Sequence, residues 1–416
     1  MKYDVIVIGA GPAGLAAALE AEKNGAKTLL VEREAFLGGI LKQCIHSGFG
    51  LVRFGENLSG PEYAHKFISK IPGSSIHIMT LTFVSKIVRQ KYGFELTLVG
   101  RKGLIKDTCQ SIVLACGCRE RTSYQAGIHG RRSAGILTAG TAQYYTNILG
   151  KLPGKRCVIL GSGDIGLIMA RRLTLEGANV LGVYEAKAKA SGLLRNVYQC
   201  IEDNNIPLYT NKTVTRVFGE GRLKAVEVSS VNDNMEPIPG TEEIIECDSL
   251  ILSVGLIPEN ELAESLGVAL DVKTKGPIVD QNCLTMSDGV YCCGNALHVN
   301  DLVDYVSENG ETAGKAAARH EFGERAFAEV KINDNLLYVV PQKLNVYELD
   351  SPVIFYFRSK NEIKKANLNI TVNGKKLDNR EYSCLRPPEM ERLKLNLSNL
   401  GITRADEISF SLTEVL

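Results

Sequence analysis

The sequence predicts an α/β protein that ends in a small β domain. Two observations predict the α/β part: an apolar, β-branched run leads into the pattern Gly-x-Gly-x-x-Gly at residues 5–14, and the same plan returns at residues 157–166. A helix-forming stretch follows each glycine turn, so each copy is a strand–turn–helix unit. A third observation, alternation of apolar and polar residues after residue 331, predicts strands at the C-terminal end.

Each glycine of these two turns has its own physical role. The first glycine lets the chain reverse, the second lets the backbone approach phosphate groups, and the third allows close contact between helix and strand. The free N–H groups at the start of the helix can then point at the pyrophosphate of a dinucleotide. A glycine-rich turn without a ligand is the alternative for either copy.

Two carboxylates support the ligand interpretation. Glu32 and Glu185 each end the strand that follows a glycine turn, roughly 20 residues farther along the chain. At that place a carboxylate can accept hydrogen bonds from the ribose hydroxyls, so we expect two bound dinucleotides. Glu185 favours NAD(H) over NADP(H) because it would repel a 2′-phosphate, whereas Lys187 and Lys189 weaken this preference.

Composition restricts the partners. The chain has 48 Lys and Arg residues against 47 Asp and Glu residues, and the net charge of +1 creates no global field toward nucleic acid or a membrane surface. We expect no nucleic-acid partner and no membrane span, because the glycine turn interrupts the uncharged run at residues 5–19. The eleven cysteines, without a secretory signal, indicate reduced thiols and a cytoplasmic location. No metal-ligand spacing occurs among the cysteines and histidines, so no metal is expected.

Further apolar runs complete the expected elements. Residues 111–117, 248–255 and 289–295 are strand-like runs that end in small-residue turns, and Glu311 to Phe322 carries a helical pattern. Four more strand-like runs lie near the C-terminus, at residues 353–357, 368–372, 393–397 and 408–412. Asn373-Gly374 follows the second of these runs and is a strong hairpin signal.

The order of these motifs carries a family resemblance. The two fingerprints, the Ala-Cys-Gly turn at 115–117, the Val-Gly-Leu-Ile-Pro turn at 254–258 and the Val-Tyr-Cys-Cys-Gly-Asn strand at 290–295 resemble the flavoproteins with two dinucleotide-binding domains, which include the pyridine-nucleotide disulfide reductases. The resemblance covers about residues 1–325. It implies FAD at the first turn and NAD(P)H at the second.

The fold class that follows is α/β, with two Rossmann-like three-layer dinucleotide-binding domains, one inserted in the other, plus a small C-terminal β domain. The expected domains are the first part of an FAD-binding domain at 1–120, an inserted NAD-binding domain at 121–247, the second part of the FAD-binding domain at 248–330 and the β domain at 331–416. The β domain carries no cofactor motif, so subunit contact and simple capping of the flavin domain are the two interpretations.

The resemblance also assigns cofactor-binding residues. The residues expected to contact FAD or NAD(H) are Gly9, Gly11, Pro12, Ala13, Gly14, Glu32, Arg33, Gly39, Ile40, Ala115, Gly117, Gly294, Asn295, Gly161, Gly163, Asp164, Ile165, Gly166, Glu185 and Gly255. Of these, Gly294 and Asn295 would lie at the ribityl chain of the flavin. Asn295 stands where the family usually has Asp, and an amide can still hydrogen-bond a hydroxyl.

Two segments narrow the resemblance. Residues 37–50 and 293–304 look like a branch of flavoprotein subunits related to sarcosine oxidase alpha, opine oxidase and cyanide-synthase subunits, the dye-linked proline dehydrogenase, and a flavoprotein paired with anaerobic-type glycerol-3-phosphate dehydrogenase. The branch implies a small-molecule electron donor or acceptor and a partner dehydrogenase subunit, with a homo-oligomer as the other possibility. His298, Asp301 and Asp304 beside the expected flavin turn could orient the flavin, face a partner or cap the turn.

Cys44 and His46 are the candidate catalytic residues. Disulfide reductases of this family need two thiols close enough to bridge beside the flavin, whereas Cys44 stands alone after Gly38-Gly39 and the sequence has no Cys-x-x-Cys. A lone thiol could form a sulfenate or a mixed disulfide, and an imidazole could exchange protons. Packing of the thiol in an apolar wall and a structural imidazole are the alternatives.

The sequence thus predicts an FAD-dependent oxidoreductase that exchanges hydride with NAD(H), as the flavoprotein subunit of a heteromeric amine, amino-acid or glycerol-3-phosphate-type dehydrogenase. A standalone NADH-dependent reductase of a small acceptor is one alternative. A nucleotide-binding scaffold subunit with no turnover of its own is the other. Rapid bleaching of the flavin by NADH would separate the enzymes from the scaffold.

Overall fold

The computed structural model describes residues 2–415 and divides the chain into two compact units. The first unit runs to Cys118 and resumes at Pro258, and the second unit comprises Arg119–Ile257. The chain passes between them in two short paired strands, β9 (Cys118–Glu120) and β19 (Leu256–Pro258). In the chain order, the second unit is therefore an insertion in the first.

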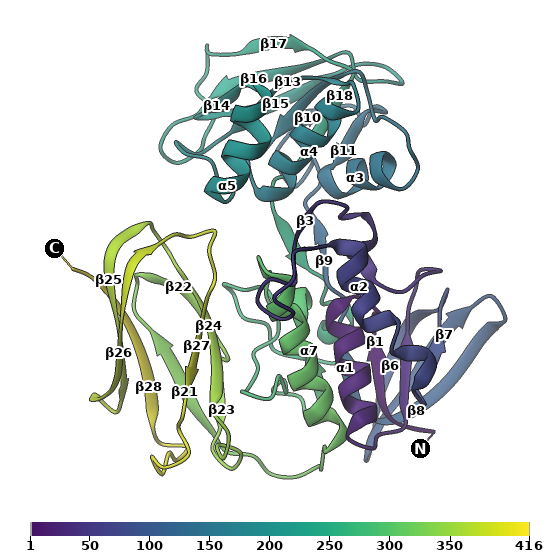
Figure 1. Cartoon of the computed structure of the whole chain (residues 1–416), viewed down its shortest axis with the longest axis vertical. Helices are drawn as coiled ribbons and strands as arrows, with labels where there is room; N and C mark the ends of the chain where they lie inside the picture. The colour runs from purple at the N-terminus through teal and green to yellow at the C-terminus, as the bar shows by residue number, and fades with distance from the viewer. Residues whose placement is uncertain (1, 416) are drawn as a thin grey trace. The chain divides into compact units, whose positions relative to one another are not determined.

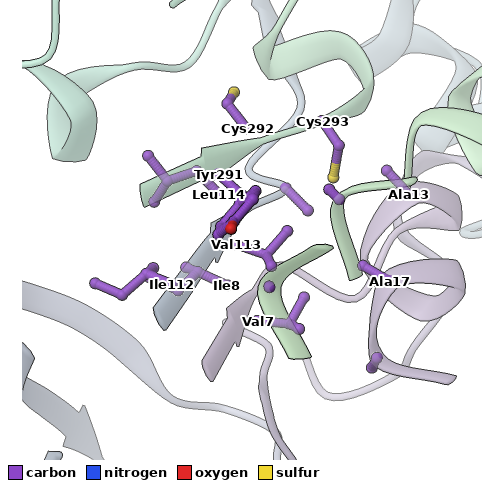
Figure 2. Close-up of a cluster of buried hydrophobic side chains, with 14 of the residues drawn as sticks. Val7, Ile8, Ala13, Ala17, Ile112, Val113, Leu114, Tyr291, Cys292 and Cys293 are labelled. Atoms are coloured by element: carbon purple, nitrogen blue, oxygen red, sulfur yellow. The ribbon is translucent and has the colours of Figure 1, made fainter. Parts of the chain in front are cut away.

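The first unit contains a mixed sheet, beside which α1 lies (Figure 1). Its strand order is β5 (His77–Met79), β2 (Thr28–Val31), β1 (Tyr3–Ile8), β8 (Gly103–Leu114), β7 (Gly93–Gly100) and β6 (Phe83–Gln90), with β20 (Val290–Cys292) also paired to β8. β5, β2, β1, β8 and β20 run parallel, whereas β6, β7 and β8 are antiparallel neighbours. Figure 2 shows how Val7, Val113 and Tyr291 from three of these strands share one buried cluster.

Two helices of the first unit pack closely because glycines face the contact. The longer helices of this unit are α1 (Pro12–Lys23), α2 (Gly60–Ile68) and α7 (Val303–Ala318). A Cβ at Gly310 of α7 would lie 2.2 Å from the Ala13 carbonyl oxygen of α1, so the two backbones touch there. The helix expected at Glu311 to Phe322 is thus found, but it begins at Val303 and ends at Ala318.

Shorter elements connect these parts of the first unit. They are the 3₁₀ turns at Gly39–Gln43, Ile71–Gly73 and Gly294–Ala296, the paired strands β3 (Ser47–Phe49) and β4 (Leu58–Ser59), and the helix α6 (Glu261–Ser265). The first of these turns follows Gly38, whose φ of +106° is the left-handed region that glycine tolerates.

The second unit contains a parallel sheet and a smaller antiparallel sheet. The parallel sheet has the order β11 (Ile136–Thr138), β18 (Ser249–Leu252), β12 (Arg156–Leu160), β13 (Asn179–Glu185) and β14 (Leu208–Thr210). Its helices are α3 (Ala139–Asn147), α4 (Asp164–Leu175) and α5 (Leu194–Asn196), the last continuing into helical turns at Val197–Ile201 and Glu202–Asn204. The smaller sheet has the order β10 (His129–Gly130), β15 (Lys212–Phe218), β16 (Ala225–Ser230) and β17 (Glu243–Glu246).

The end of the inserted domain differs from the expected Cys247. β18 pairs with β11 and β12 inside the second unit, so the run after residue 247 belongs to this unit and not to the first. The unit closes at Ile257 instead. The α/β class itself is confirmed, because both units are built on parallel strands joined by helices.

The C-terminal β domain is a pair of sheets. One has the order β23 (Lys343–Asn345), β21 (Phe327–Ile332), β28 (Glu407–Glu414), β25 (Ile363–Val372) and β26 (Lys375–Leu385), and the other has the order β22 (Leu336–Val340), β24 (Val353–Ser359) and β27 (Glu391–Leu395). Phe355, Phe357 and Phe410 fill the core of this domain. The first strand begins at Phe327, so the domain starts slightly before the expected residue 331. Asn373-Gly374, both with positive φ, join β25 to β26 as the hairpin signal predicts.

Candidate functional site

The first glycine turn lies between β1 and α1, and its outer glycines are required by the protein itself. Gly9 has φ of +101°, and a Cβ there would lie 2.4 Å from the Ala115 carbonyl oxygen at the end of β8. A Cβ at Gly14 would lie 1.8 Å from the Gly9 carbonyl oxygen. Both contacts are far below van der Waals distance, so neither position can hold a side chain without moving the turn.

The middle glycine, Gly11, has no such requirement. Its φ of −73° and ψ of −175° are open to any residue, and the nearest atom to an added Cβ would be the Gly39 Cα, 4.0 Å away. Pro12 and Ala13 then begin α1, whose first N–H groups lack helical partners. A glycine without a steric requirement of its own is expected where the backbone must approach a phosphate. The turn at residues 9–14 and the start of α1 therefore form a cradle that fits a pyrophosphate.

In the second turn, between β12 and α4, the outer glycines again have no room for a side chain and the middle glycine does. Gly161 has φ of +96°, and a Cβ there would lie 2.1 Å from the Ser253 carbonyl oxygen, while a Cβ at Gly166 would lie 2.5 Å from the Gly161 carbonyl oxygen. At Gly163 the nearest atom would be the Ser253 Oγ, 3.7 Å away. The two cradles therefore have the same geometry and leave the same position open.

The two predicted acids, Glu32 and Glu185, each accept a hydrogen bond from the backbone of their glycine turn. Glu32 Oε2 accepts a hydrogen bond of 2.8 Å from the Ala10 N–H, and Oε1 accepts one of 2.8 Å from the Glu34 N–H. Glu185 Oε2 accepts from the N–H and the hydroxyl of Ser162. Each carboxylate thus anchors the residue between the first two glycines of its turn.

The carboxylates differ in how many acceptor positions they leave. A carboxylate has about four lone-pair positions, and Glu32 uses two of them in the contacts above. Glu185 also accepts from the Ser191 hydroxyl at 3.1 Å and the Lys187 N–H at 3.0 Å, which brings its hydrogen bonds to four. Three of these four bonds are on Oε2 and one is on Oε1, so Oε1 keeps an acceptor position for a ribose hydroxyl at the second turn.

Asp164 and Ile165 form the first turn of α4, as the fingerprint predicts. Asp164 Oδ1 accepts from the Leu193 N–H at 2.8 Å and from Asn196 Nδ2 at 2.7 Å. The carboxylate therefore fixes the segment after β13 beside the helix start. The carbonyl oxygen of Gly255, another residue expected to contact a cofactor, accepts from the Arg121 N–H at 3.1 Å.

Ser253 is the residue that the sequence analysis missed in the second unit. It lies against Gly161 as Ala115 lies against Gly9. The signal was present: Leu-Ser-Val-Gly at 252–255 matches Leu-Ala-Cys-Gly at 114–117 in position after its strand.

Several predicted FAD contacts gather around the start of α1. A Cβ at Gly39 would lie 2.9 Å from the Gly11 Cα, and a Cβ at Gly294 would lie 2.7 Å from the Ala13 Cβ, so both glycines allow close approach to this helix start. Ile40, next to Gly39, is 60% exposed. The backbone of residues 39, 115 and 294 thus surrounds the first cradle.

Three more predicted residues lie beside this group. Asn295 Oδ1 accepts from the backbone N–H of Asn300 at 3.0 Å, and its Nδ2 lies 3.6 Å from Cys118 Sγ. Gly117 has φ of +75°, and its carbonyl oxygen accepts from the Glu259 N–H at 3.0 Å. Arg33 is largely exposed and lies 3.8 Å from Glu259.

Cys44 and His46 follow the turn that carries Gly39. The Cys44 thiol donates to the Ile40 carbonyl oxygen at 3.4 Å, and burial raises the pKa of this thiol to about 12. His46 Nδ1 lies 3.0 Å from the Ser47 carbonyl oxygen, and its ring centroid is 5.0 Å from that of Phe49. A thiol with this pKa is neutral near pH 7, whereas redox exchange needs the thiolate. The Cys44 thiol is thus hydrogen-bonded within its own turn, and the His46 ring is tilted by 38° against that of Phe49.

His298, Asp301 and Asp304 follow the Gly294 turn, and two of them make polar contacts with other segments. Asp301 pairs with Arg358 of the β domain at 2.8 Å, and Asp304 Oδ1 accepts from the Arg53 N–H at 3.0 Å. His298 is fully buried. Two of the three residues therefore join other segments of the first unit to the segment after the Gly294 turn.

The part of the chain at residues 2–415 has neither a metal-ligand cluster nor a membrane-spanning helix. Within residues 2–415, no group of three or more His, Cys, Asp or Glu side chains is arranged to hold a metal ion. Among the helices in that range, none combines the length and apolar character needed to cross a membrane.

Comparison with known proteins agrees with this geometry. The family model described as pyridine nucleotide-disulphide oxidoreductase matches residues 3–318. Among curated relatives, hydrogen cyanide synthase subunit HcnB of Pseudomonas protegens is 26% identical over 64% of this chain and 60% of its own length. An opine oxidase subunit of Agrobacterium tumefaciens is 25% identical over 76% of this chain and 64% of its own length. The chain thus spans about three fifths of the length of these two relatives.

A solved structure shows the same fold. Thioredoxin reductase of T. acidophilum superposes with a TM-score of 0.63 at 24% identity, covering 76% of this chain and 98% of its own. The family uses FAD with NAD(P)H, and the two open glycine cradles fit two such dinucleotides. The chain belongs to the pyridine nucleotide-disulphide oxidoreductase family and is an oxidoreductase of the FAD type.

Proposed function

We propose that this protein binds FAD at the first cradle, exchanges hydride with NAD(H) held at the second, and serves as the flavoprotein subunit of a heteromeric dehydrogenase of amines, amino acids or a polyol phosphate. The observation that carries the proposal is the pair of open middle glycines, Gly11 and Gly163, each framed by two glycines that the protein needs for itself. Reduced thiols in all eleven cysteines support a cytoplasmic location.

In this proposal the residues around α1 hold FAD. The first N–H groups of α1 bind the pyrophosphate, and Glu32 binds the ribose with its two remaining acceptor positions. Asn295 hydrogen-bonds the ribityl chain. FAD, when bound, supplies a two-electron centre that accepts hydride from a reduced nicotinamide.

Glu185 supports NAD(H) as the preferred nicotinamide dinucleotide. The residue is 6% exposed at the end of β13, where a 2′-phosphate would face a buried negative charge. Asp164 adds a second carboxylate at the start of α4. Lys187 and Lys189 follow Glu185 and oppose this effect.

Substrate oxidation on a partner polypeptide fits the structure better than a thiol relay. The Cys44 thiol has a raised pKa, and none of the eleven cysteines forms a disulfide. Two of the relatives named above are described as subunits, of a hydrogen cyanide synthase and of an opine oxidase. These names suggest the substrate class only by analogy.

Substrate turnover with and without co-purified subunits tests this proposal. The isolated chain is expected to be reduced by NADH but to oxidise no amine, amino acid or polyol phosphate until its partner is added. Cys44→Ser should keep NADH-driven flavin reduction within about tenfold, because no thiol step is required. Rapid substrate oxidation by the isolated chain, or complete loss of flavin reduction in the variant, would contradict the proposal.

A further inference from the structure

We propose that the C-terminal β domain positions Asn295 for the flavin, through Arg358. The inference rests on the proposed FAD site. The β domain carries no glycine cradle, yet one of its arginines reaches the segment that follows the predicted ribityl turn. Arg358 is a positioning residue in this account, because it acts on the cofactor through other residues.

Arg358 lies on β24 and is almost buried, with a side chain 12% exposed. On its own domain, Nε donates to the Tyr338 hydroxyl at 2.8 Å and Nη1 donates to the Pro387 carbonyl oxygen at 3.1 Å. Toward the flavin turn, Nη2 donates to the Val299 carbonyl oxygen at 3.2 Å and to Asp301 Oδ1 at 2.8 Å. One planar guanidinium therefore fixes the segment 299–301 to the β domain.

Asp301 strengthens the same connection from the other side. Its second oxygen, Oδ2, accepts from the Met390 N–H of the β domain at 3.0 Å. The carboxylate is 13% exposed and is shared between a guanidinium and a backbone N–H. A charge-assisted pair with this much burial and a second donor has a defined geometry, unlike an exposed ion pair.

Asn300 passes this constraint to Asn295. Its backbone N–H donates to Asn295 Oδ1 at 3.0 Å, and its Nδ2 lies 3.2 Å from the same oxygen. The oxygen of Asn295 is thereby used, and its Nδ2 is directed to the other side, toward Cys118 Sγ. An aspartate at position 295 would have no donor on that side, so the amide gives this turn a hydrogen-bond donor of fixed direction.

His298 fixes the start of the segment by packing. Its ring is fully buried, with centroids 6.0 Å from Tyr338 and 5.6 Å from Tyr356 of the β domain. Burial and the nearby Arg358 charge lower the pKa of this imidazole to about 3, so the ring is neutral at physiological pH. Aromatic contacts and the Arg358 hydrogen bonds thus hold the two ends of residues 298–301.

Arg392 provides a matched comparison. It lies on β27 opposite Tyr356 and also joins the β domain to the flavin domain, with bonds of 2.8 Å and 2.7 Å to the two oxygens of Glu308 on α7. These two bonds go to Glu308 and not to residues 299–301. Loss of Arg392 should therefore weaken domain docking while leaving the Asn295 turn in place.

The test compares FAD binding by the apoproteins of wild type, Arg358→Met and Arg392→Met, using quenching of flavin fluorescence. We expect Arg358→Met to raise the FAD dissociation constant by at least about tenfold and to shift the reduction potential of the bound flavin. Arg392→Met should stay within about threefold of wild type, and Arg358→Lys should recover part of the loss. Urea midpoints of the apoproteins report any general loss of stability.

The outcomes separate this inference from the function on which it rests. Equal FAD affinity and potential in wild type and folded Arg358→Met would overturn the inference, as would equal losses in the two Met variants. If Arg358→Met does not fold, Asn300→Ala replaces it, and unchanged FAD binding by Asn300→Ala would overturn the inference. Failure of wild type to bind FAD would instead contradict the proposed function.

Discussion

At the scale of single residues, the outer and middle glycines of each turn lack a side chain for different reasons. Gly9 and Gly14 are needed because carbonyl oxygens of the chain fill the space of a Cβ. Gly11 has open space and an ordinary φ, so the protein itself does not require a glycine there, and we infer that its lack of a side chain serves the cofactor. Stability and cofactor binding should therefore respond to different glycines of one motif.

Gly11→Ala and Gly14→Ala test this separation. Gly11→Ala is expected to keep the free energy of unfolding of the apoprotein within about 0.5 kcal/mol while raising the FAD dissociation constant at least about tenfold. Gly14→Ala should lower the unfolding free energy by roughly 1–3 kcal/mol or more, because the added methyl meets a carbonyl oxygen. Urea unfolding and FAD titration measure the two effects, and a Gly11→Ala protein with normal FAD binding would contradict the first assignment.

At the scale of elements, α1, which follows the first glycine turn, packs against α7, which follows the Gly294 turn. Gly310 and Gly314 of α7 face Ala13 and Ala17 of α1 with no room for a Cβ. The small residues that lower the helix propensity of α7 are thus the ones that let the helices touch. Packing against α1, and not helix propensity, therefore determines which residues stand at these positions of α7.

Gly310→Ala is therefore expected to destabilise the fold, although alanine is the better helix former by about 1 kcal/mol. The added Cβ would lie 2.2 Å from the Ala13 carbonyl oxygen. We expect a loss of roughly 1–3 kcal/mol in unfolding free energy, measured by urea denaturation. Lys315→Ala on the exposed face of the same helix is the control and should change it by less than about 0.5 kcal/mol. A stabilised Gly310→Ala would show that the helices are not in contact.

This element also shows what the sequence could and could not predict. Both strand–turn–helix units were predictable because their signals are local: an apolar run, three spaced glycines and a carboxylate. The start of α7 was not, since Asn309-Gly310 is typical of a break until the partner helix is known. The end of the inserted unit was also missed, because only the pairing of β18 with β12 decides its membership.

At the scale of the whole chain, long-range contacts define the parts of the candidate site that no motif carries. Arg358 and Asp301 are 57 residues apart and meet only through the fold. Ser191, whose hydroxyl donates to Glu185 Oε2, gave no signal either. The glycines and acids could be predicted from spacing, whereas the residues that orient or cover them could not.

Asp280 is a buried carboxyl group next to the β domain, and its titration makes the stability of the protein depend on pH. Asp280 lines a cavity of about 20 Å³ together with Asn309 of α7 and Tyr356 of β24, which is room for one water. Its Oδ1 accepts from the N–H groups of Asn282 and Leu284. Burial is the main cause that raises its pKa from 3.8 to about 7; the charge of Glu348 adds to this, and Arg325 opposes it.

Asp280 should make the protein less stable as pH rises. Its folded-state pKa is above the unfolded value, so the folded form binds more protons between about pH 4 and pH 7 and loses stability through that window, by up to about 1.4 kcal/mol per pH unit. Asp280→Asn should remove this slope. Asp271→Asn is the control, because Asp271 makes the same kind of turn, to Lys273 and Thr274, without full burial. Parallel pH profiles of wild type and Asp280→Asn would contradict the assignment.

Anaerobic rapid mixing of the FAD-loaded chain with NADH tests the central claim, that hydride passes between a nucleotide at the second cradle and a flavin at the first. Wild type should lose its visible flavin absorption rapidly with NADH and more slowly with NADPH. Gly163→Ala, whose added Cβ would have its nearest contact 3.7 Å away, should retain FAD but be reduced at least about tenfold more slowly. Absence of reduction in wild type, or an unchanged rate in Gly163→Ala, would contradict the account.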